Sequence, residues 1–270
     1  MFIPEAIDLG QSEKYDLSIR IRPDGFMFSI SEPDAGSNYC LRETTFSEET
    51  LLKNVQKIIF DLNFLTQQYH STNVILVSSS YDIVPLEFYQ NKIDKKNAIF
   101  SFVHTSEATH ILSCENVRQR NVTLFNVESE LYEFLSRSLF NPVFMHHTNP
   151  LINLFENKGK SISMTSRMFV NFHDDMFDII CFSKTQMIHC LSYHEESINN
   201  QLYYILKLWE SCGFDQLNDW IHIVGEPEKK VMEGIQTYIK NIETSNYPTE
   251  AFLWNKDAQK APLDLLALSL

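Results

Sequence analysis

The sequence predicts an α/β protein made of two tandem halves, each with the element order strand, strand, strand, helix, strand. Three observations support this fold class. Short runs alternate between polar and apolar residues, longer segments repeat apolar residues with a helical period, and the whole order of elements occurs twice along the 270 residues. We therefore expect a mixed β-sheet with helices packed on it in each half.

The first half begins with a predicted β-hairpin, because residues 18–22 and 26–30 alternate in polarity around Pro23-Asp24-Gly25. Proline followed by Asp-Gly is typical of a tight turn, since proline sets φ and glycine tolerates a positive φ. The apolar periodicity then predicts the rest of the first repeat. It comprises a strand at 39–43, a helix from Ser47 to about His70 and a strand at 74–77 that is buried on both faces.

Additional elements follow in the first half before the repeat begins again. The same patterns of alternation and helical spacing predict strands at 109–114, 122–127 and 143–147, and helices at 129–140 and 149–156.

The second half repeats the order without an insertion. Strands are expected at 168–172, 177–182 and 187–193, then a helix from Glu195 to Gly213 and a buried strand at 220–224. Gly213 suits the left-handed residue that commonly ends a helix. A helix at 228–242 and a strand at 251–254 complete the prediction. With a boundary between Asn157 and Ser163, the expected domains are residues 1–160 and 161–270.

Composition and charge exclude several function classes. The 22 Lys and Arg against 35 Asp and Glu give a formal charge of -13, which repels a nucleic-acid backbone. No apolar run approaches the roughly 20 residues of a transmembrane helix, and no secretory leader is visible at the N-terminus. The 5 cysteines are scattered, as expected for thiols in a reducing compartment, so we expect a cytoplasmic protein.

The duplicated strand and helix order resembles that of the actin-like ATPase superfamily, which has a duplicated ribonuclease H-like fold. Segments such as Met168-Phe169-Val170-Asn171-Phe172 and Phe177-Asp178-Ile179-Ile180 also resemble an uncharacterised family of the Bacteroidetes, a domain of unknown function. The resemblance covers nearly the whole chain. It implies the actin-like fold, and for this family it implies no activity.

The superfamily binds ATP with three motifs, and this sequence departs from each of them. The first phosphate loop would fall on Asp24-Gly25, where Asp and Gly are adjacent. The second would fall on Asp174-Asp175, where no glycine can bring backbone N–H groups to a phosphate and two carboxylates repel one. The adenosine motif would fall on Gly225-Glu226, a single glycine followed by a carboxylate. With only 7 glycines in the chain, we expect no nucleotide cofactor.

Other residue groups have simpler interpretations. Ser78, Ser79 and Asp82 follow a buried strand at the end where α/β proteins bind ligands, but no nucleophile elbow is present, so we predict no catalytic residue. The spacing from Cys181 to His189 does not suit a structural zinc site, so no metal site is predicted. The apolar tail after Lys260 must cover something, and we expect it to pack on its own domain. The alternatives are a second subunit or a membrane surface, the latter disfavoured because no Lys or Arg follows Lys260.

These observations favour a pseudoenzyme that acts as an interaction or scaffold module, with another protein or a second copy of the chain as partner. The alternative is a divergent ATPase or kinase that binds Mg-ATP between its halves, and a third class is a sensor that binds a small ligand at residues 78–82. The candidate residues lining a cleft between the halves are Asp24, Gly25, Ser78, Ser79, Asp82, Asp174, Asp175, Gly225 and Glu226.

Overall fold

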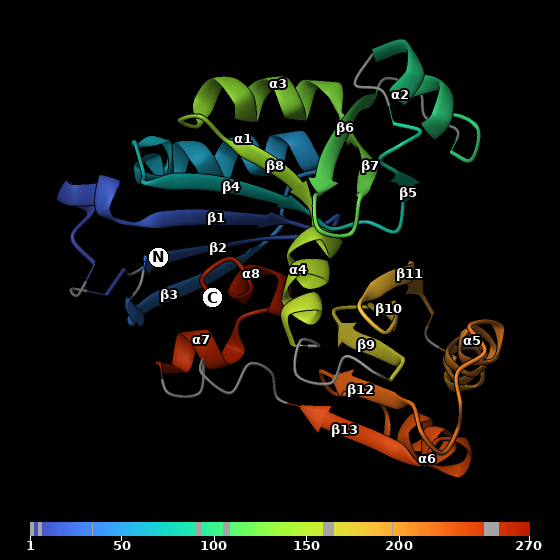
Figure 1. Cartoon of the computed structure of the whole chain (residues 1–270). Coiled ribbons are helices and arrows are strands. Elements are labelled where there is room, and N and C mark those ends of the chain that lie inside the picture. Colours follow the sequence, from blue (N-terminus) through green and yellow to red (C-terminus); the bar gives the residue numbers. More distant parts are fainter. Residues whose placement is uncertain are drawn as a thin grey trace. The chain divides into compact units, whose positions relative to one another are not determined.

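Each half of the chain forms a five-stranded mixed sheet, and the two sheets have equivalent strand orders (Figure 1). The computed structural model describes residues 3–4, 7–33, 35–89, 93–104, 109–158, 165–195, 197–245 and 254–270. The chain divides into two compact units, Met1–Pro150 with Glu250–Leu270 and Leu151–Thr249. The predicted duplication of a β-β-β-α-β order is therefore confirmed within both units.

The sheet of the first unit has the order β3-β2-β1-β4-β8. Its first three strands form an antiparallel meander, and β4 and β8 run parallel to β1. The strands are β1 (Asp16–Ile21), β2 (Gly25–Glu32), β3 (Ala35–Thr45), β4 (Ser71–Leu76) and β8 (Val143–His146).

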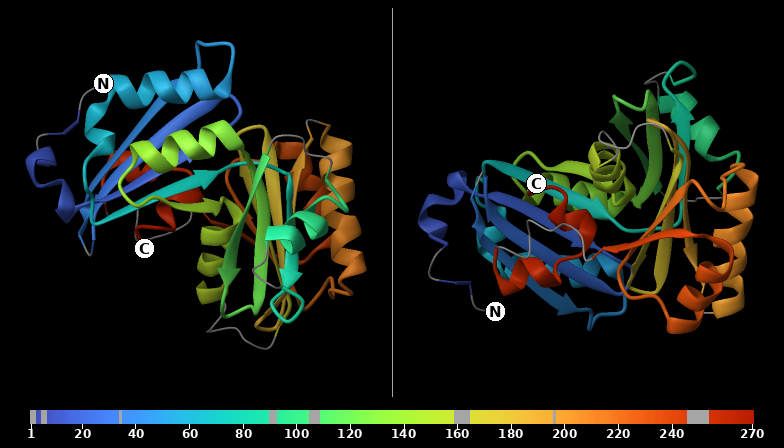
Figure 2. Two further views of the ribbon diagram at one scale, coloured as in Figure 1. Left: turned by 90° about the horizontal axis from the view of Figure 1, so that it is seen from above. Right: turned by 60° about the horizontal axis from the view of Figure 1, so that its bottom comes forward.

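Helices cover both faces of this sheet, as the views in Figures 1 and 2 agree. Helices α1 (Leu51–Asp61) and α3 (Ser129–Ser138) lie on one face, and α7 (Lys256–Lys260) and α8 (Leu263–Leu266) lie on the other. Consequently both faces of β1 are buried, with Ile19 fully buried on one and Arg20 only 1% exposed on the other.

The helix predicted from Ser47 to about His70 is shorter in the structure. Thr50 caps α1 by accepting a hydrogen bond from the Lys53 amide, and the Asn54 side chain accepts from the amides of Ser47 and Glu48. These bonds keep the preceding residues in a turn outside the helix. The chain beyond Asp61 tightens into a 3₁₀ helix, Asn63–Thr66, instead of continuing the α-helix.

The inserted region of the first unit forms a three-stranded antiparallel sheet with the order β5-β7-β6. Its elements are β5 (Tyr81–Pro85), α2 (Ile93–Phe100), β6 (Thr109–Asn116) and β7 (Asn121–Glu128). The strands predicted at 109–114 and 122–127 are confirmed. Neither β5 nor α2 was predicted, because β5 is short and contains Asp82 and Pro85, residues that are rare in strands.

The sheet of the second unit has the order β11-β10-β9-β12-β13, again with a meander followed by two parallel strands. Helices α5 and α6 pack on one face of this sheet. The hydrophobic core between them includes Val170 and Ile179 of the sheet and Trp209 of α5. On the opposite face, Phe155 of α4 stacks on Phe169 with their ring centroids 4.3 Å apart. The elements are α4 (Thr148–Lys158), β9 (Arg167–His173), β10 (Met176–Ser183), β11 (Gln186–His194), α5 (Ile198–Ser211), β12 (Trp220–Val224), α6 (Lys229–Tyr238) and β13 (Asn241–Ser245).

The C-terminal ends of α5 and α6 show which local signals were sufficient to predict where a helix stops. Helix α5 ends as predicted, with Gly213 in the left-handed region at φ +66°. The predicted helix at 228–242 is wrong at its C-terminal end, because α6 stops at Tyr238 and the chain becomes β13, with Ile242 opposite Ile221 of β12. Pairing with a neighbouring strand overrides the helical spacing of the apolar residues. The strand predicted at 251–254 falls mostly outside the described residues.

The C-terminal segment 254–270 packs on the first unit, whereas the predicted boundaries assign it to the second. Leu265 and Leu266 are buried there, and Ser269 lies 3.1 Å from Ser31 of β2. The tail thus covers the chain's own sheet, but one formed by residues far away in the sequence. The part of the chain that the structure describes has no helix long and apolar enough to cross a membrane.

The thiols of Cys181 and Cys212 are neighbours in the second unit. Their contact predicts that Cys212 is more reactive than Cys114 of the first unit. A hydrogen bond from Cys181 lowers the pKa of Cys212, whereas burial raises the pKa of Cys114 to about 11. Both Cys212 and Cys114 are partly exposed. Because the thiolate is the nucleophile, we expect iodoacetamide at about pH 8 to label Cys212 several-fold faster than Cys114, as measured by peptide mass spectrometry. A Cys181→Ala variant should slow labelling of Cys212, and equal rates for Cys212 and Cys114 would contradict the assignment.

Candidate functional site at the carboxyl ends of the sheets

The candidate residues of the first unit lie mainly at one edge of its sheet. β1 and β4 are parallel with Ile21 opposite Leu76, so the turn that contains Asp24 and Gly25 and the loop that contains Ser78 and Ser79 follow neighbouring strand ends. The Val77 amide donates to the Ile21 carbonyl at 3.0 Å and extends this pairing into the loop. The structure therefore brings these candidates to the same edge, where α/β sheets usually bind ligands.

The first hairpin turn is occupied by the protein's own side chains. The Arg22 guanidinium lies 3.3 Å from the Asp24 carboxylate and 3.4 Å from that of Glu43. A Cβ added at Gly25 would lie 2.7 Å from Nη2 of Arg22, so this guanidinium rests against the glycine. Arg22 therefore pairs with carboxylates of the protein itself in this turn.

Ser78 is positioned by a buried histidine at the end of β8. Nε2 of His146 lies 3.0 Å from the Ser78 carbonyl and 3.4 Å from its hydroxyl, and Nδ1 lies 2.8 Å from the Thr148 hydroxyl. His146 is fully buried, and both of its ring nitrogens lie next to polar groups of the protein. Ser79 is exposed.

Asp82 lies away from the turn, in β5 of the inserted sheet, where it pairs with Leu124. The imidazole of His104 stands beside it, with Nε2 3.5 Å from the Asp82 carboxylate and Nδ1 3.3 Å from the Ser80 hydroxyl. Burial raises the pKa of Asp82, and His104 opposes that shift. Asp82 therefore belongs to a different part of the first unit from Asp24 and Gly25.

The second unit repeats the arrangement at the ends of β9 and β12. These strands are parallel with Asn171 opposite Val224, so the Asp174-Asp175 turn and the Gly225-Glu226 loop lie at one edge. Gly225 has φ +81°, and a Cβ there would lie 2.0 Å from the Phe172 carbonyl oxygen. Only glycine fits this close approach, so Gly225 serves the packing of the two loops against each other.

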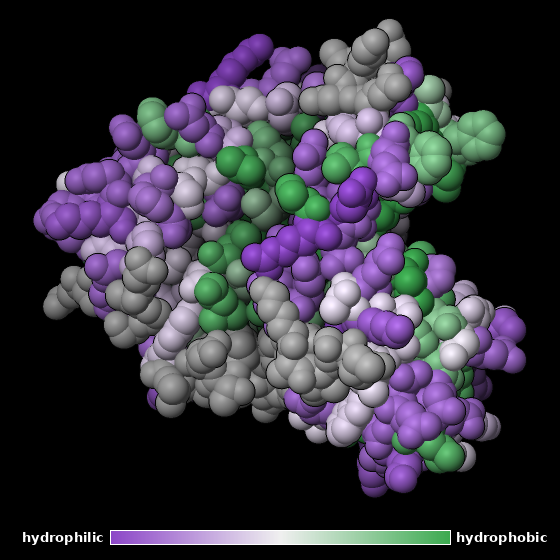
Figure 3. All heavy atoms as spheres, in the orientation of Figure 1, coloured by the Kyte–Doolittle hydropathy of each residue, from purple (hydrophilic) through white to green (hydrophobic). Residues whose placement is uncertain are grey.

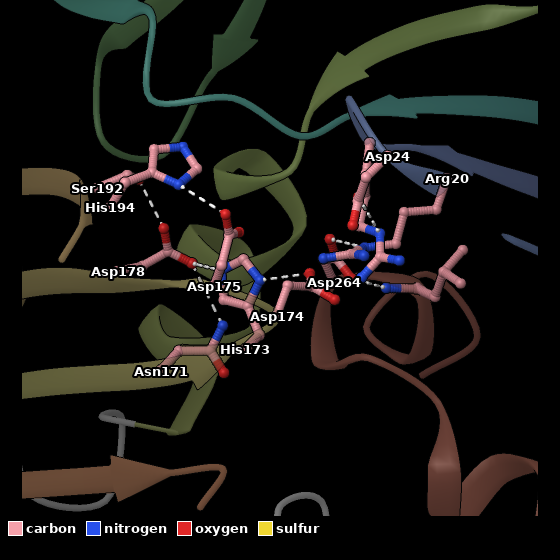
Figure 4. A network of polar contacts seen from close by, with 12 residues as sticks. Arg20, Asp24, Asn171, His173, Asp174, Asp175, Asp178, Ser192, His194 and Asp264 are labelled. Carbon is pink, nitrogen blue, oxygen red and sulfur yellow. Dashed lines mark hydrogen bonds and ion pairs between the residues drawn. The ribbon is translucent and has the colours of Figure 1, made fainter. Parts of the chain in front are cut away.

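His173 links two carboxylates in this turn (Figure 4). Its Nδ1 lies 3.0 Å from Asp174 and its Nε2 lies 2.8 Å from Asp178, whose side chain is fully buried. Asp178 also accepts hydrogen bonds from Ser192 at 2.6 Å and from Asn171 at 3.3 Å. An ionised carboxylate only accepts hydrogen bonds, so these donors stabilise its charge in the interior.

The turn itself is held in an unusual backbone conformation. Asp174 has φ +51°, in the left-handed region that Asp tolerates better than most residues. Asp175 faces His194 across the hairpin at 3.4 Å. Asp174 and Asp175 are therefore engaged in local pairs. Sequence reasoning named neither His173 nor Asp178 as site residues, although a carboxylate within the apolar strand Phe177–Phe182 was a usable signal.

A pocket of about 430 Å³ opens beside this turn within the second unit. One side is formed by the turn and the other by the connection from β12 to α6, with Pro227 between two acidic residues. The described lining of the pocket includes no Lys or Arg. It includes five carboxylic side chains, those of Asp174, Asp175, Glu195, Glu226 and Glu228. The pocket is chemically suited to a cationic group and unsuited to an anion.

Comparisons with known proteins agree with the fold. A protein of Bacteroides thetaiotaomicron, described as having an actin-like ATPase fold and unknown function, has 24% identity and a TM-score of 0.82, covering 97% of this chain and 98% of its own. The PilM-PilN type IV pilus biogenesis complex matches 94% of this chain and 97% of its own at 8% identity and a TM-score of 0.50. No curated protein matches the chain significantly.

The family comparison covers most of the sequence. The family described as "Protein of unknown function (DUF3822)" matches residues 4–242. The resemblances stated from the sequence, to an actin-like fold and to an uncharacterised family, are thus confirmed. The chain has the actin-like ATPase fold and belongs to the DUF3822 family.

Proposed function

We propose that this protein is a non-catalytic member of the actin-like fold that acts as an interaction or scaffold module, with a degenerate nucleotide site. The observation that supports the proposal most strongly is the acidic lining of the pocket beside the Asp174-Asp175 turn. By the resemblance to the superfamily, the second phosphate loop would fall on this turn. A loop that binds phosphate needs close backbone N–H groups and neutral or basic surroundings.

The charges that line the pocket support the absence of a polyphosphate site there. Two like charges about 5 Å apart near a protein surface repel each other by roughly 3 kcal/mol. Several such pairs between a triphosphate and the lining carboxylates would exceed the roughly 8 kcal/mol of binding free energy that micromolar affinity requires. A divalent cation could offset part of this repulsion, but Asp174 already pairs with His173.

The other two loops support the same proposal. In the first turn, Arg22 is neutralised by Asp24 and Glu43, and its guanidinium occupies the space over Gly25. In the third, Gly225 lies against the Phe172 carbonyl, so its lack of a side chain serves packing. The turns at Asp24-Gly25 and Asp174-Asp175 and the loop at Gly225-Glu226 therefore offer no open, basic surface to a phosphate.

A partner protein, or a second copy of the chain, is the proposed ligand. The PilM-PilN structure shows that a protein of similar fold occurs in a protein complex, which supports the proposal at the level of the fold. The formal charge of -13 argues against nucleic acid. We place the protein in the cytoplasm, where its five free thiols would stay reduced.

Isothermal titration with ATP and Mg²⁺ tests the missing nucleotide site. We expect no saturable heat at up to about 1 mM ATP, which corresponds to a binding free energy weaker than about 4 kcal/mol. The folded state of the sample is verified by its thermal unfolding transition in the same buffer. Micromolar affinity would overturn the proposal.

The alternative is a divergent ATPase or kinase, since the superfamily that the chain resembles binds ATP and the chain has its fold. In that case Asp24 or Asp174 would hold Mg²⁺ against the phosphates. ATP binding that is lost on Asp24→Asn or Asp174→Asn substitution would support this alternative. ATP binding that survives both substitutions would show that neither Asp24 nor Asp174 holds the Mg²⁺ ion.

A further inference from the structure

Strand β5 is an edge strand of the inserted three-stranded sheet. In the order β5-β7-β6 it pairs with β7 alone, from Tyr81 opposite Phe125 to Pro85 opposite Asn121, and no other strand of the described residues pairs with it. In an antiparallel pair, alternate residues direct their backbone N–H and C=O groups away from the partner strand. β5 therefore presents backbone donors and acceptors along its second edge, which is a template for another strand.

A groove of about 480 Å³ runs along this strand. Three consecutive residues of β5, Asp82 to Val84, form one wall, and the end of α2 with the turn after it forms the other, through Ile99, Phe102 and Val103. Successive side chains of a strand point to opposite faces of the sheet. A hollow that touches three residues in succession thus follows the edge of the strand and does not lie over one face.

The groove and its rim are apolar and exposed to solvent. Phe102 is 93% exposed and Val103 is 69% exposed, and both line the groove. Figure 3 shows hydrophobic side chains gathered over α2 and the neighbouring strand at the upper right of the molecule. Neighbouring apolar side chains with such high exposure are typical of a surface that binds another molecule.

One charge lies at the groove. The Oδ2 atom of Asp82 is buried without a hydrogen-bond partner among the described residues, and Oδ1 lies 3.5 Å from His104. A buried carboxylate oxygen without a hydrogen-bond partner destabilises the folded protein, more so when it is charged. The Asp82 side chain lines the groove and is 21% exposed, so the site combines an apolar channel with one negative anchor for a cationic group.

We propose that an extended peptide segment of a partner protein adds to the free edge of β5 as a fourth strand. Its alternate apolar side chains fill the groove between β5 and α2, and a Lys or Arg of the segment pairs with Asp82. Peptides bind in this way to other proteins that have an exposed sheet edge, where backbone hydrogen bonds provide affinity and side-chain pockets provide specificity. The proposal rests on the proposed role as an interaction module and adds where and how a partner binds.

Peptide selection with a matched variant tests the groove. A phage-displayed library of random dodecapeptides is selected against the full chain and, in parallel, against a Phe102→Asp/Val103→Asp double variant. Both positions are exposed, so the variant should keep the melting temperature of the parent protein. We expect the parent chain to enrich peptides in which apolar residues alternate and a Lys or Arg recurs at one position, and the variant to lose them.

Fluorescence anisotropy with the most enriched peptide then tests the binding mode. We expect at least a tenfold weaker affinity for the double variant, and a similar loss when alternate backbone amides of the peptide are N-methylated. Asp82→Asn should remove the preference for a basic residue. Bound peptide should also slow hydrogen exchange of the amides of β5.

The outcomes separate this groove from the general proposal. Peptides that bind parent and double variant equally would overturn the groove but leave an interaction module at another surface. A selection without any enriched peptide would overturn strand addition at β5. Micromolar ATP binding would overturn the proposed function independently of both results, because it is measured without a peptide.

Discussion

Replacing Asp264 with alanine is expected to lower the free energy of unfolding of the first unit by about 3–5 kcal/mol. Asp264 of α8 accepts a hydrogen bond from Nε of Arg20 at 2.7 Å, and the Arg20 side chain is fully buried beneath the C-terminal segment (Figure 4). Without this carboxylate, the guanidinium of Arg20 would remain in the interior without the negative charge of Asp264 beside it. The loss is large because a buried charge cannot be solvated by water instead.

The chain offers a matched control in the same segment. Arg42 and Asp257 also lie 2.7 Å apart, but their side chains are 22% and 32% exposed. Asp257→Ala should therefore cost only about 1–2 kcal/mol, including its hydrogen bond from the Leu41 amide. Urea denaturation followed by circular dichroism measures both variants.

A double replacement distinguishes the buried charge from simple loss of packing. In an Arg20→Met/Asp264→Leu variant both charges are absent, so most of the stability lost in Asp264→Ala should return. Equal losses for Asp264→Ala and Asp257→Ala would contradict the assignment of Arg20 and Asp264 as the main anchor of the tail.

The second large effect is expected at Gly225, where alanine should cost the second unit about 3 kcal/mol. Two penalties combine. The backbone has φ +81°, which L-residues rarely adopt, and the new Cβ would lie 2.0 Å from the Phe172 carbonyl oxygen. Either the loop after β12 or the end of β9 must move to relieve this contact.

Gly213 provides the control, because it shares only one of the two penalties. Its φ is +66°, but no atom lies within 4 Å of an added Cβ. Gly213→Ala should cost about 1 kcal/mol, from backbone strain alone. Thermal and urea unfolding measure both variants, and a Gly225→Ala variant as stable as Gly213→Ala would show that the loops are not packed as described.

The predicted elements that held were those with strong local patterns. The hairpins around Asp24 and Asp174 have turn residues flanked by alternating strands, and the helix that ends at Gly213 has both apolar spacing and a terminating glycine. Elements whose pattern was ambiguous were missed. β13 retains helical spacing but pairs with β12, and β5 has too few residues and too many polar ones to be recognised.

The candidate site was predicted by chain order and completed by pairing. Ser78 was named because it follows a predicted strand, and Asp24, Asp174 and Gly225 were named because the ATP-binding motifs of the resembled superfamily would fall on them. The parallel registers bring these residues to sheet edges within each unit. The partners that define their chemistry are distant in sequence or hidden in apolar strands, as Asp178 and His146 are. Local spacing carries no information about which side chains will meet across a sheet.

By itself the sequence determined the α/β class, the duplicated order of elements and the acidic, glycine-poor character of the turns, because these depend on local spacing and composition. Only the tertiary structure decided that residues 254–270 return to the first sheet, that Arg20 meets Asp264, and that five carboxylates line one pocket. Such contacts join residues up to 244 positions apart. They depend on the summed packing of the whole chain, which no short pattern of residues encodes.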